Sequence, residues 1–328
     1  MRPTGTELHF TPEWTVNIHN VQKASADDKK IPYRLNNKIG YFTEEGKIDS
    51  CIEFPFKSSI SDSWYCTYLQ NNAKTDFYLA DGTKAGTIEN EGFPFIDEDR
   101  IYIMLPGGNS FAKISEDGKT EWSYENYSPL TAFSSSKGGT VAGYADGSII
   151  SFDTEGKISQ MFNPGGSDIE VILGADISDN GNIIACVSGQ NNQRFVVAER
   201  NEGHSRIIFH EYLGSQLNRQ TLVRFSPKAD FVYYNFNGGL GIVNLLNSTA
   251  KKIPVNGKIL QVEFSDDGQL VFVLSHEKNI YTIMVLEKNI HQMADFSFEG
   301  NSSFIQTRSN SLFVGRNNKI SRISISNK

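Results

Sequence analysis

Short apolar runs that alternate with clusters of polar turn residues are the main pattern along this chain. The pattern is clearest at residues 129–163, where runs at 130–133, 139–144, 148–152 and 157–162 are separated by Gly, Asp, Ser and Glu. Apolar runs of this length predict β-strands, and the Asp-Gly and Glu-Gly pairs between them predict hairpins because Gly tolerates positive φ. We therefore expect a four-stranded antiparallel meander here.

Tight-turn signals recur along the whole chain. The first four glycines of these signals are 36, 36 and 38 residues apart, and the later signals follow at looser intervals. In order, the signals are Glu45-Gly46, Asp81-Gly82, Asp117-Gly118, Glu155-Gly156, Glu202-Gly203, Asn247-Ser248, Lys288-Asn289 and Asn327. A β-rich unit that repeats at this length predicts the blade of a β-propeller. Eight signals predict eight blades, and seven is the alternative because residues 20–37 contain no clear inner strand.

A second repeat supports this all-β architecture. Segments 177–182, 225–230 and 264–269 each place a Ser and a polar turn between an apolar residue and a β-rich run. They resemble the inner-strand turn of WD-repeat-like and YVTN-type bacterial propellers, although the Trp-Asp dipeptide of true WD repeats is missing. The expected blades are 20–54, 56–90, 92–126, 129–163, 168–212, 219–254, 257–298 and 302–326.

The last of these blades lacks an outer strand, which residues 13–18 are expected to supply. Trp14 and Val16 carry this prediction, because residues 13–16 match residues 121–124 and Trp14 precedes Trp122 by 108 residues, three times 36. A closing strand covers sheet edges that otherwise promote aggregation. We expect one domain over residues 1–328, with residues 13–18 completing blade 302–326.

The acidic-Gly turns followed by Lys or Trp point to a known repeat family. Segments 116–122 and 144–148 resemble the PQQ-like, or quinoprotein-like, repeat, and the resemblance covers residues 13–163 best. The family includes eight-bladed redox enzymes and non-catalytic scaffolds such as the lipoprotein of the outer-membrane barrel assembly machinery. The enzymes carry a vicinal Cys-Cys pair and a Trp in every blade. This chain has neither, so we expect no quinone and no other cofactor.

Composition narrows the function classes. A net charge of −7 argues against a broad nucleic-acid-binding surface. The sequence contains no run of 18 apolar residues, so we expect no transmembrane helix. Cys51, Cys66 and Cys186 form no CxxC motif; buried free thiols are expected, with a Cys51–Cys66 bridge left open. The first five residues contain no apolar export signal. We expect a periplasmic or other extracytoplasmic protein whose signal has been removed, with a cytoplasmic protein as the alternative.

No catalytic constellation stands out in the sequence. Walker, GxSxG, HExxH and EF-hand spacings are absent, and we predict no catalytic, cofactor-binding or metal-ligating residues. The long insertions near residues 189–194 and 211–220 indicate a contact surface that includes Asn191, Asn192, Arg194 and Tyr212. We expect a monomeric, non-catalytic scaffold or assembly factor that binds a protein partner. The alternative is a propeller that binds or cleaves a small ligand or carbohydrate in its central funnel.

Overall fold

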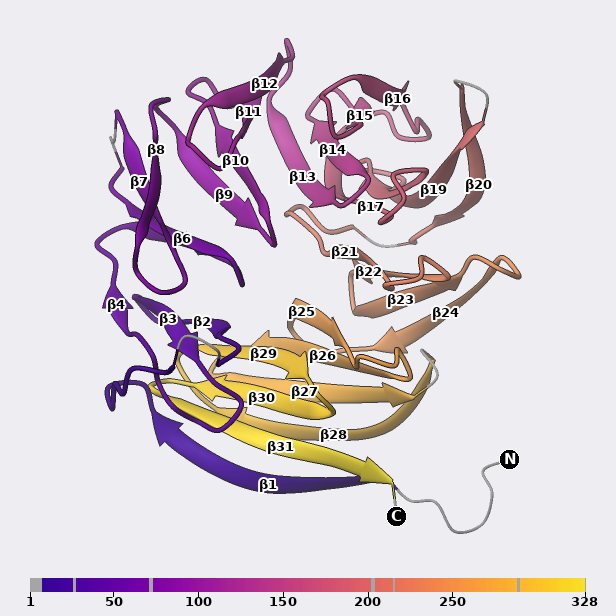
Figure 1. Cartoon of the computed structure of the whole chain (residues 1–328). Coiled ribbons are helices and arrows are strands. Elements are labelled where there is room, and N and C mark those ends of the chain that lie inside the picture. The colour runs from indigo at the N-terminus through magenta and orange to yellow at the C-terminus, as the bar shows by residue number, and fades with distance from the viewer. Residues whose placement is uncertain are drawn as a thin grey trace. The chain divides into compact units, whose positions relative to one another are not determined.

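The described part of the chain consists of β-strands in eight antiparallel sheets. The computed structural model describes residues 8–25, 28–70, 73–201, 204–214, 216–287 and 290–327, and within these ranges it contains no helix. Seven of the sheets have four strands and one has three (Figure 1). The sheets fall at the eight expected blades, so the β-rich repeat and the preference for eight units are confirmed.

The strands follow one another as meanders within each sheet. The sheets of the first half contain β2 (Ile31–Leu35), β3 (Lys38–Phe42), β4 (Ile52–Glu53), β5 (Lys57–Ile60), β6 (Trp64–Tyr68), β7 (Thr75–Leu79), β8 (Lys84–Ile88), β9 (Phe93–Asp97), β10 (Arg100–Met104), β11 (Ser110–Ile114), β12 (Thr120–Glu125), β13 (Leu130–Ser136), β14 (Gly139–Tyr144), β15 (Ile149–Phe152) and β16 (Ile158–Phe162).

The second half repeats the arrangement. Its strands are β17 (Ile172–Ile177), β18 (Ile183–Ser188), β19 (Arg194–Asn201), β20 (His204–Tyr212), β21 (Val223–Phe225), β22 (Phe231–Phe236), β23 (Gly239–Asn244), β24 (Thr249–Pro254), β25 (Lys258–Phe264), β26 (Leu270–Glu277), β27 (Ile280–Glu287), β28 (His291–Glu299), β29 (Ser303–Arg308), β30 (Ser311–Arg316) and β31 (Lys319–Asn327), with β1 (Leu8–Asn17) added to the last sheet.

The chain divides into two compact units. Unit 1 comprises the described parts of Met1–Ile101, Glu116–Gly118 and Glu263–Lys328, and unit 2 comprises Tyr102–Ser115 and the described parts of Lys119–Val262. Each unit has its own apolar clusters. One cluster of unit 1 contains Ile18, Ile31, Tyr33, Leu35, Phe42, Ile48, Phe304, Phe313 and Ile320, and one of unit 2 contains Val171, Leu173, Ala185, Val187, Phe195, Val197, Leu213, Val223, Phe225, Val232, Tyr234 and Val243. The organisation of the chain as one domain stays a prediction.

Burial explains why some strands read as continuous apolar runs and others alternate. Every residue of β14 and of β17 is buried, so most of their side chains are apolar or small, and Asp176 in β17 is the charged exception. The outermost strand β12 instead alternates between exposed and half-buried positions. The pattern of the sequence therefore follows the position of each strand within its sheet.

The regularly spaced glycines adopt the backbone that the sequence predicts. Gly46, Gly82, Gly118 and Gly156 have φ values of 87°, 90°, 89° and 83°, and each precedes the last strand of its sheet. The Gly46, Gly82 and Gly156 amides each donate to the carbonyl three residues earlier, at 3.0, 2.9 and 3.1 Å. Ser248 has φ 54° in the β23–β24 turn, whereas the signals at 202–203 and 288–289 lie outside the described residues.

The serine turns share one hydrogen-bonding scheme. The Oγ atoms of Ser178, Ser226 and Ser265 accept from the amide five residues later at 3.0, 3.0 and 2.9 Å. The residue three positions after each serine lies in the left-handed region, with φ 71° at Gly181, 54° at Ala229 and 69° at Gly268. The polar residues in these segments are therefore used by the turns themselves.

The first sheet, β2-β3-β4, has three strands in the described residues, one fewer than the repeat predicts. The chain between β1 and β2 is mostly polar, and its described residues make one isolated parallel bridge, from Val21 to Ile48. An inner strand of this sheet does exist at Ile31–Leu35, inside the segment that the sequence left without a clear strand. Its residues do alternate in burial, with Ile31, Tyr33 and Leu35 buried, but Pro32 within so short a run weakens the strand signal.

The N-terminal strand completes the last sheet, as the sequence predicts. β1 pairs antiparallel with β31, with Trp14 opposite Arg322 and Val16 opposite Ile320 (Figure 1). The strand is longer than the expected residues 13–18, because it begins at Leu8. It lies at the edge of the sheet in the order β1-β31-β30-β29.

Trp14 and Trp122 occupy equivalent positions in the two units. Trp14 Nε1 donates to the Glu44 carbonyl at 3.1 Å in unit 1, and Trp122 Nε1 donates to the Thr154 carbonyl at 3.3 Å in unit 2. Each indole ring also packs against the glycine two residues after that carbonyl, Gly46 or Gly156. A Cβ added to either glycine would be in steric conflict with the ring. The cationic residue opposite each tryptophan, Arg322 or Lys113, donates to the same carbonyl.

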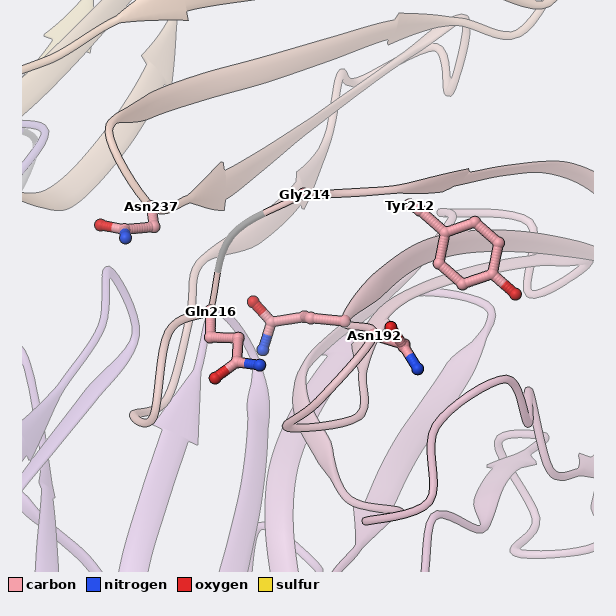
Figure 2. A pocket seen from close by; sticks show the side chains of 6 residues that line it. Asn192, Tyr212, Gly214, Gln216 and Asn237 are labelled. Atoms are coloured by element: carbon pink, nitrogen blue, oxygen red, sulfur yellow. The ribbon is translucent and has the colours of Figure 1, made fainter.

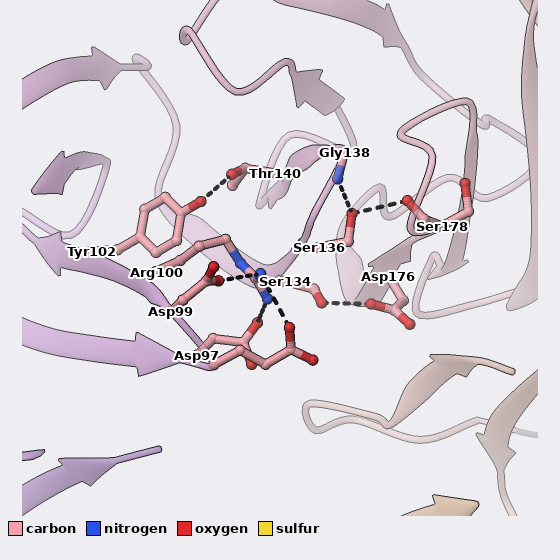
Figure 3. Close-up of polar contacts among 11 residues, drawn as sticks. Asp97, Asp99, Arg100, Tyr102, Ser134, Ser136, Gly138, Thr140, Asp176 and Ser178 are labelled. Atoms are coloured by element: carbon pink, nitrogen blue, oxygen red, sulfur yellow. Dashed lines mark hydrogen bonds and ion pairs between the residues drawn. The ribbon is translucent and has the colours of Figure 1, made fainter. Parts of the chain in front are cut away.

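A buried carboxylate, Asp176, links three neighbouring sheets of unit 2, and Figure 3 shows its hydrogen bond to Ser134. Asp176 on β17 is 4% exposed and accepts from Ser134 Oγ on β13 at 2.5 Å and from the Phe225 amide on β21 at 2.7 Å. Burial raises the pKa of Asp176, and the charge of Arg224 and these hydrogen bonds only partly oppose that shift. The other cluster in Figure 3 belongs to unit 1, where Arg100 pairs with acidic residues of its own hairpin.

Removal of the Trp14 ring is expected to loosen the closing strand. Trp14→Ala and the matched Trp122→Ala should each lower the free energy of unfolding by about 3 kcal/mol, because both lose a packed indole and its hydrogen bond. Only Trp14→Ala should speed amide hydrogen exchange in β1 and β31, measured by mass spectrometry. Equal exchange of β1 in the two variants would contradict the closing role of Trp14.

The Asp176 carboxyl is expected to make stability depend on pH. Because its pKa is higher in the folded protein than its ordinary value of 3.8, its stabilising contribution is complete below that value and is lost as pH rises through the raised pKa. Asp176→Asn keeps an acceptor for Phe225 and should remove this dependence. Asp176→Ala should lower the free energy of unfolding at pH 7 by about 2–4 kcal/mol, because the Phe225 amide loses its acceptor. Chemical denaturation between pH 4 and pH 8 measures both effects.

Candidate functional site

A polar pocket of about 520 Å³ lies in unit 2, at the sheets β17–β20 and β21–β24 (Figure 2). Its lining comes from the end of β20 and from three connections: the β18–β19 loop, the segment that follows β20, and the β22–β23 turn. The lining residues are Asn192, Gln193, Tyr212, Gly214, Gln216 and Asn237. None of these six residues is charged, and four of them carry side-chain amides.

Gln193 holds two of these connections together. Its side chain is 2% exposed, and its Nε2 donates to the Gly189 carbonyl at 2.9 Å and to the Leu217 carbonyl at 3.1 Å. Its Oε1 accepts from the Leu217 amide at 3.2 Å. A buried amide that is satisfied in this way fixes the segment after β20 against the β18–β19 loop, so the pocket is formed in advance of any ligand.

Asn191 fixes the same loop on its other side. Its Oδ1 accepts from Ser167 Oγ at 2.6 Å and from the Ile169 amide at 3.0 Å, and its Nδ2 donates to Asp168 at 3.2 Å. Its backbone carbonyl also accepts from Ser167 Oγ. The side chain of Asn191 is thus engaged within the protein, and its observed role is to position the loop.

Arg194 and Tyr212 form a stacked pair beside the pocket. They lie opposite each other on β19 and β20, and the guanidinium carbon is 5.8 Å from the centre of the tyrosine ring. Gly166 lies close to both side chains, where a Cβ would be 2.7 Å from Arg194 Nη1 and 3.2 Å from the Tyr212 hydroxyl. Tyr212 nevertheless remains 55% exposed.

The residues next to this pair along β19 and β20 are packed, and their polar groups have partners. Phe195 stacks on Tyr234 with ring centroids 4.0 Å apart, and the Tyr234 hydroxyl donates to Glu211, which also pairs with Lys252 at 3.2 Å. Burial raises the pKa of Tyr234 and raises that of Cys186 to about 12, so both groups stay protonated near neutral pH. The Cys186 thiol is therefore not an activated nucleophile.

The four residues that the sequence nominated fall in one neighbourhood. Asn192 and Tyr212 line the pocket, Arg194 lies against Tyr212, and Asn191 anchors the loop. Their role in binding stays a prediction. Sequence reasoning missed Gln193, Gln216 and Asn237; the first two lie in or beside the insertions that it had singled out, and the third lies in an Asn-Gly-Gly turn.

The described residues offer neither a disulfide nor a metal-binding cluster. Cys51, Cys66 and Cys186 are free thiols. Within the described ranges, no group of three or more His, Cys, Asp or Glu side chains is placed to hold a metal ion. The same ranges contain no helix of the length and hydrophobicity needed to cross a membrane.

Comparisons with known proteins agree on the fold. A family model described as beta-propeller protein matches residues 1–328. An uncharacterized protein of Treponema pallidum (strain Nichols) is 25% identical over 334 residues, which cover 98% of this chain and 89% of that protein.

Two solved structures are similar in fold. BamB from Moraxella catarrhalis is 14% identical with a TM-score of 0.61, over 96% of this chain and 100% of that one. The C-terminal WD40 domain of Sif2 is 13% identical with a TM-score of 0.65, over 97% and 98% of the two chains. These likenesses match the two repeat types that the sequence resembles.

Loss of the Gln193 amide is expected to open the pocket wall. Gln193→Leu leaves the Leu217 amide and two carbonyls without partners, so the free energy of unfolding should fall by about 2–4 kcal/mol, measured by chemical denaturation. Gln160→Leu is the control, because the equally buried Gln160 makes one hydrogen bond, to the Asn182 carbonyl. Amide exchange at Leu217 should accelerate in the first variant only; unchanged protection there would contradict the role of Gln193.

Proposed function

The chain belongs to the beta-propeller proteins, and from this premise we propose that it is a non-catalytic scaffold that presents preformed loops to a protein partner. The observation that carries the proposal is the pocket of unit 2, whose rim is held by Gln193 and Asn191 and displays a half-exposed tyrosine. A surface fixed in advance binds with a smaller loss of conformational entropy than mobile loops do.

The composition of the rim supports a protein contact. Tyrosine and arginine are enriched among the residues that dominate binding energy at protein interfaces, and Tyr212 and Arg194 are stacked here. Ile169 adds an apolar side chain that is 51% exposed, next to the Asn191 loop. Together these residues form a small apolar and aromatic surface with polar amides beside it, as in the core and rim of an interface.

A small polar ligand is the second candidate. The pocket volume of about 520 Å³ lies within the range of small-molecule sites. Its amide side chains offer both donors and acceptors, which suits a ligand rich in hydroxyl or amide groups. The extracytoplasmic location of the protein stays a prediction.

Site-specific photo-crosslinking in the native host tests the scaffold function. A benzophenone amino acid at Ile169 leaves Arg194 and Tyr212 intact, and the matched position Ile158 on β16 is 44% exposed away from the pocket. We expect a discrete protein adduct from position 169, its loss when Tyr212→Ala is added, and none from position 158. Identical adduct patterns at the two positions would exclude this surface as the contact.

A further inference from the structure

Arg194 has no counter-ion in the described part of the protein. Its Nε is buried without a hydrogen-bond partner, and none of the described carboxylates forms an ion pair with its guanidinium. The ring of Tyr212 makes a cation–π contact with the guanidinium but carries no compensating negative charge. A guanidinium without a carboxylate partner donates strong charge-assisted hydrogen bonds when a carboxylate is supplied.

Some arginines of the acidic chain pair with carboxylates, whereas Arg194 and Arg316 each lie over an aromatic ring with no carboxylate partner among the described residues. Arg206 on the neighbouring strand β20 pairs with Glu199 at 3.0 Å, and Arg308 in unit 1 pairs with Asp62 at 2.7 Å. The carboxylate of Glu211, adjacent to Tyr212, is occupied by Tyr234 and Lys252. The guanidinium beside the pocket is thus left available for a carboxylate from outside.

The pocket next to Arg194 supplies complementary neutral groups. The side-chain amides of Asn192 and Gln216 make no hydrogen bond to other described residues, and each can donate and accept at once. A peptide main chain also presents N–H and C=O groups side by side. Its C=O can accept from the NH2 group of a side-chain amide while its N–H donates to the oxygen of that amide. A volume of about 520 Å³ is large enough for a few residues of an extended segment.

We propose that this site binds an extended acidic segment of a partner protein. The carboxylate of the segment pairs with the Arg194 guanidinium above the Tyr212 ring, and its main chain bonds to the amides of Asn192 and Gln216. A charged hydrogen-bonded pair gives the specificity, because a neutral side chain leaves the guanidinium unpaired. The inference rests on the proposed scaffold function and names the chemistry of the partner.

Binding of peptide pools to the full chain tests this assignment. Three pools of fluorescein-labelled octapeptides carry Glu-Glu, Gln-Gln or Lys-Lys at the two central positions and are randomised elsewhere, and fluorescence anisotropy measures their affinity. We expect the Glu-Glu pool to bind about tenfold more tightly than the Gln-Gln pool. Arg194→Gln should remove that difference, and Arg206→Gln, which deletes the same charge on β20, should preserve it.

A second variant guards against misfolding of the first. Asn192→Asp adds a carboxylate to the pocket at a position with φ 52°, which Asp tolerates as Asn does, and it should also weaken the Glu-Glu pool about tenfold. Equal binding of the Glu-Glu and Gln-Gln pools, or no effect of either variant, overturns the inference. Displacement of the peptides by a neutral hexasaccharide at lower concentration than by peptide overturns it in favour of a sugar site.

The crosslinking and peptide experiments fail in different ways. A protein adduct at position 169 without selection for the Glu-Glu pool leaves the scaffold function in place and removes the acidic segment as its ligand. Selection of the Glu-Glu pool, with its dependence on Arg194, supports the acidic ligand even where crosslinking finds no protein.

Discussion

The antiparallel pairing of β1 with β31 is the contact on which the last sheet depends. Without β1, the backbone groups on one side of β31 have no partner, and an open edge of this kind promotes pairing with other chains. Trp14 stabilises the pairing, because its indole ring contacts the turn at Gly46 and its N–H donates to the Glu44 carbonyl. One aromatic side chain thus joins the closing strand to the turn of the first sheet.

Many polar side chains in the described part of the protein form hydrogen bonds that hold the fold together. Acidic and amide side chains that resemble candidate chemistry in the sequence are used inside turns, as at Asn180 and Asp267, or between strands, as at Asp176. Around the pocket, the side chains of Gln193 and Asn191 are likewise engaged in hydrogen bonds within the protein. Beside the pocket, by contrast, Arg194 has no carboxylate partner among the described residues, and the side-chain amides of Asn192 and Gln216 make no hydrogen bond to them, which is why the proposed function is binding.

Much of the fold could be predicted because its turns are local. A glycine at positive φ between two apolar runs leaves a mark in the sequence, and the spacing of four such glycines gave the repeat that the structure confirms. Trp14 could be placed because it repeats Trp122. The three-stranded first sheet could not be foreseen, since a strand as short as Ile52–Glu53 carries no periodic pattern. Asp176 and Gln193 were also beyond reach, because their partners are set by tertiary packing.

The use of the N-terminal strand as the final strand has a consequence for synthesis on the ribosome. β1 leaves the exit tunnel before β2 to β30, and its partner β31 leaves after them, so β1 stays unpaired while the intervening sheets emerge. Contacts between chain segments so far apart in sequence form slowly. The entropy cost of closing a long loop comes before the favourable free energy of the contacts. During that interval the nascent chain carries exposed strand edges, and a chaperone that shields β1 until β31 has emerged would raise the yield of native protein.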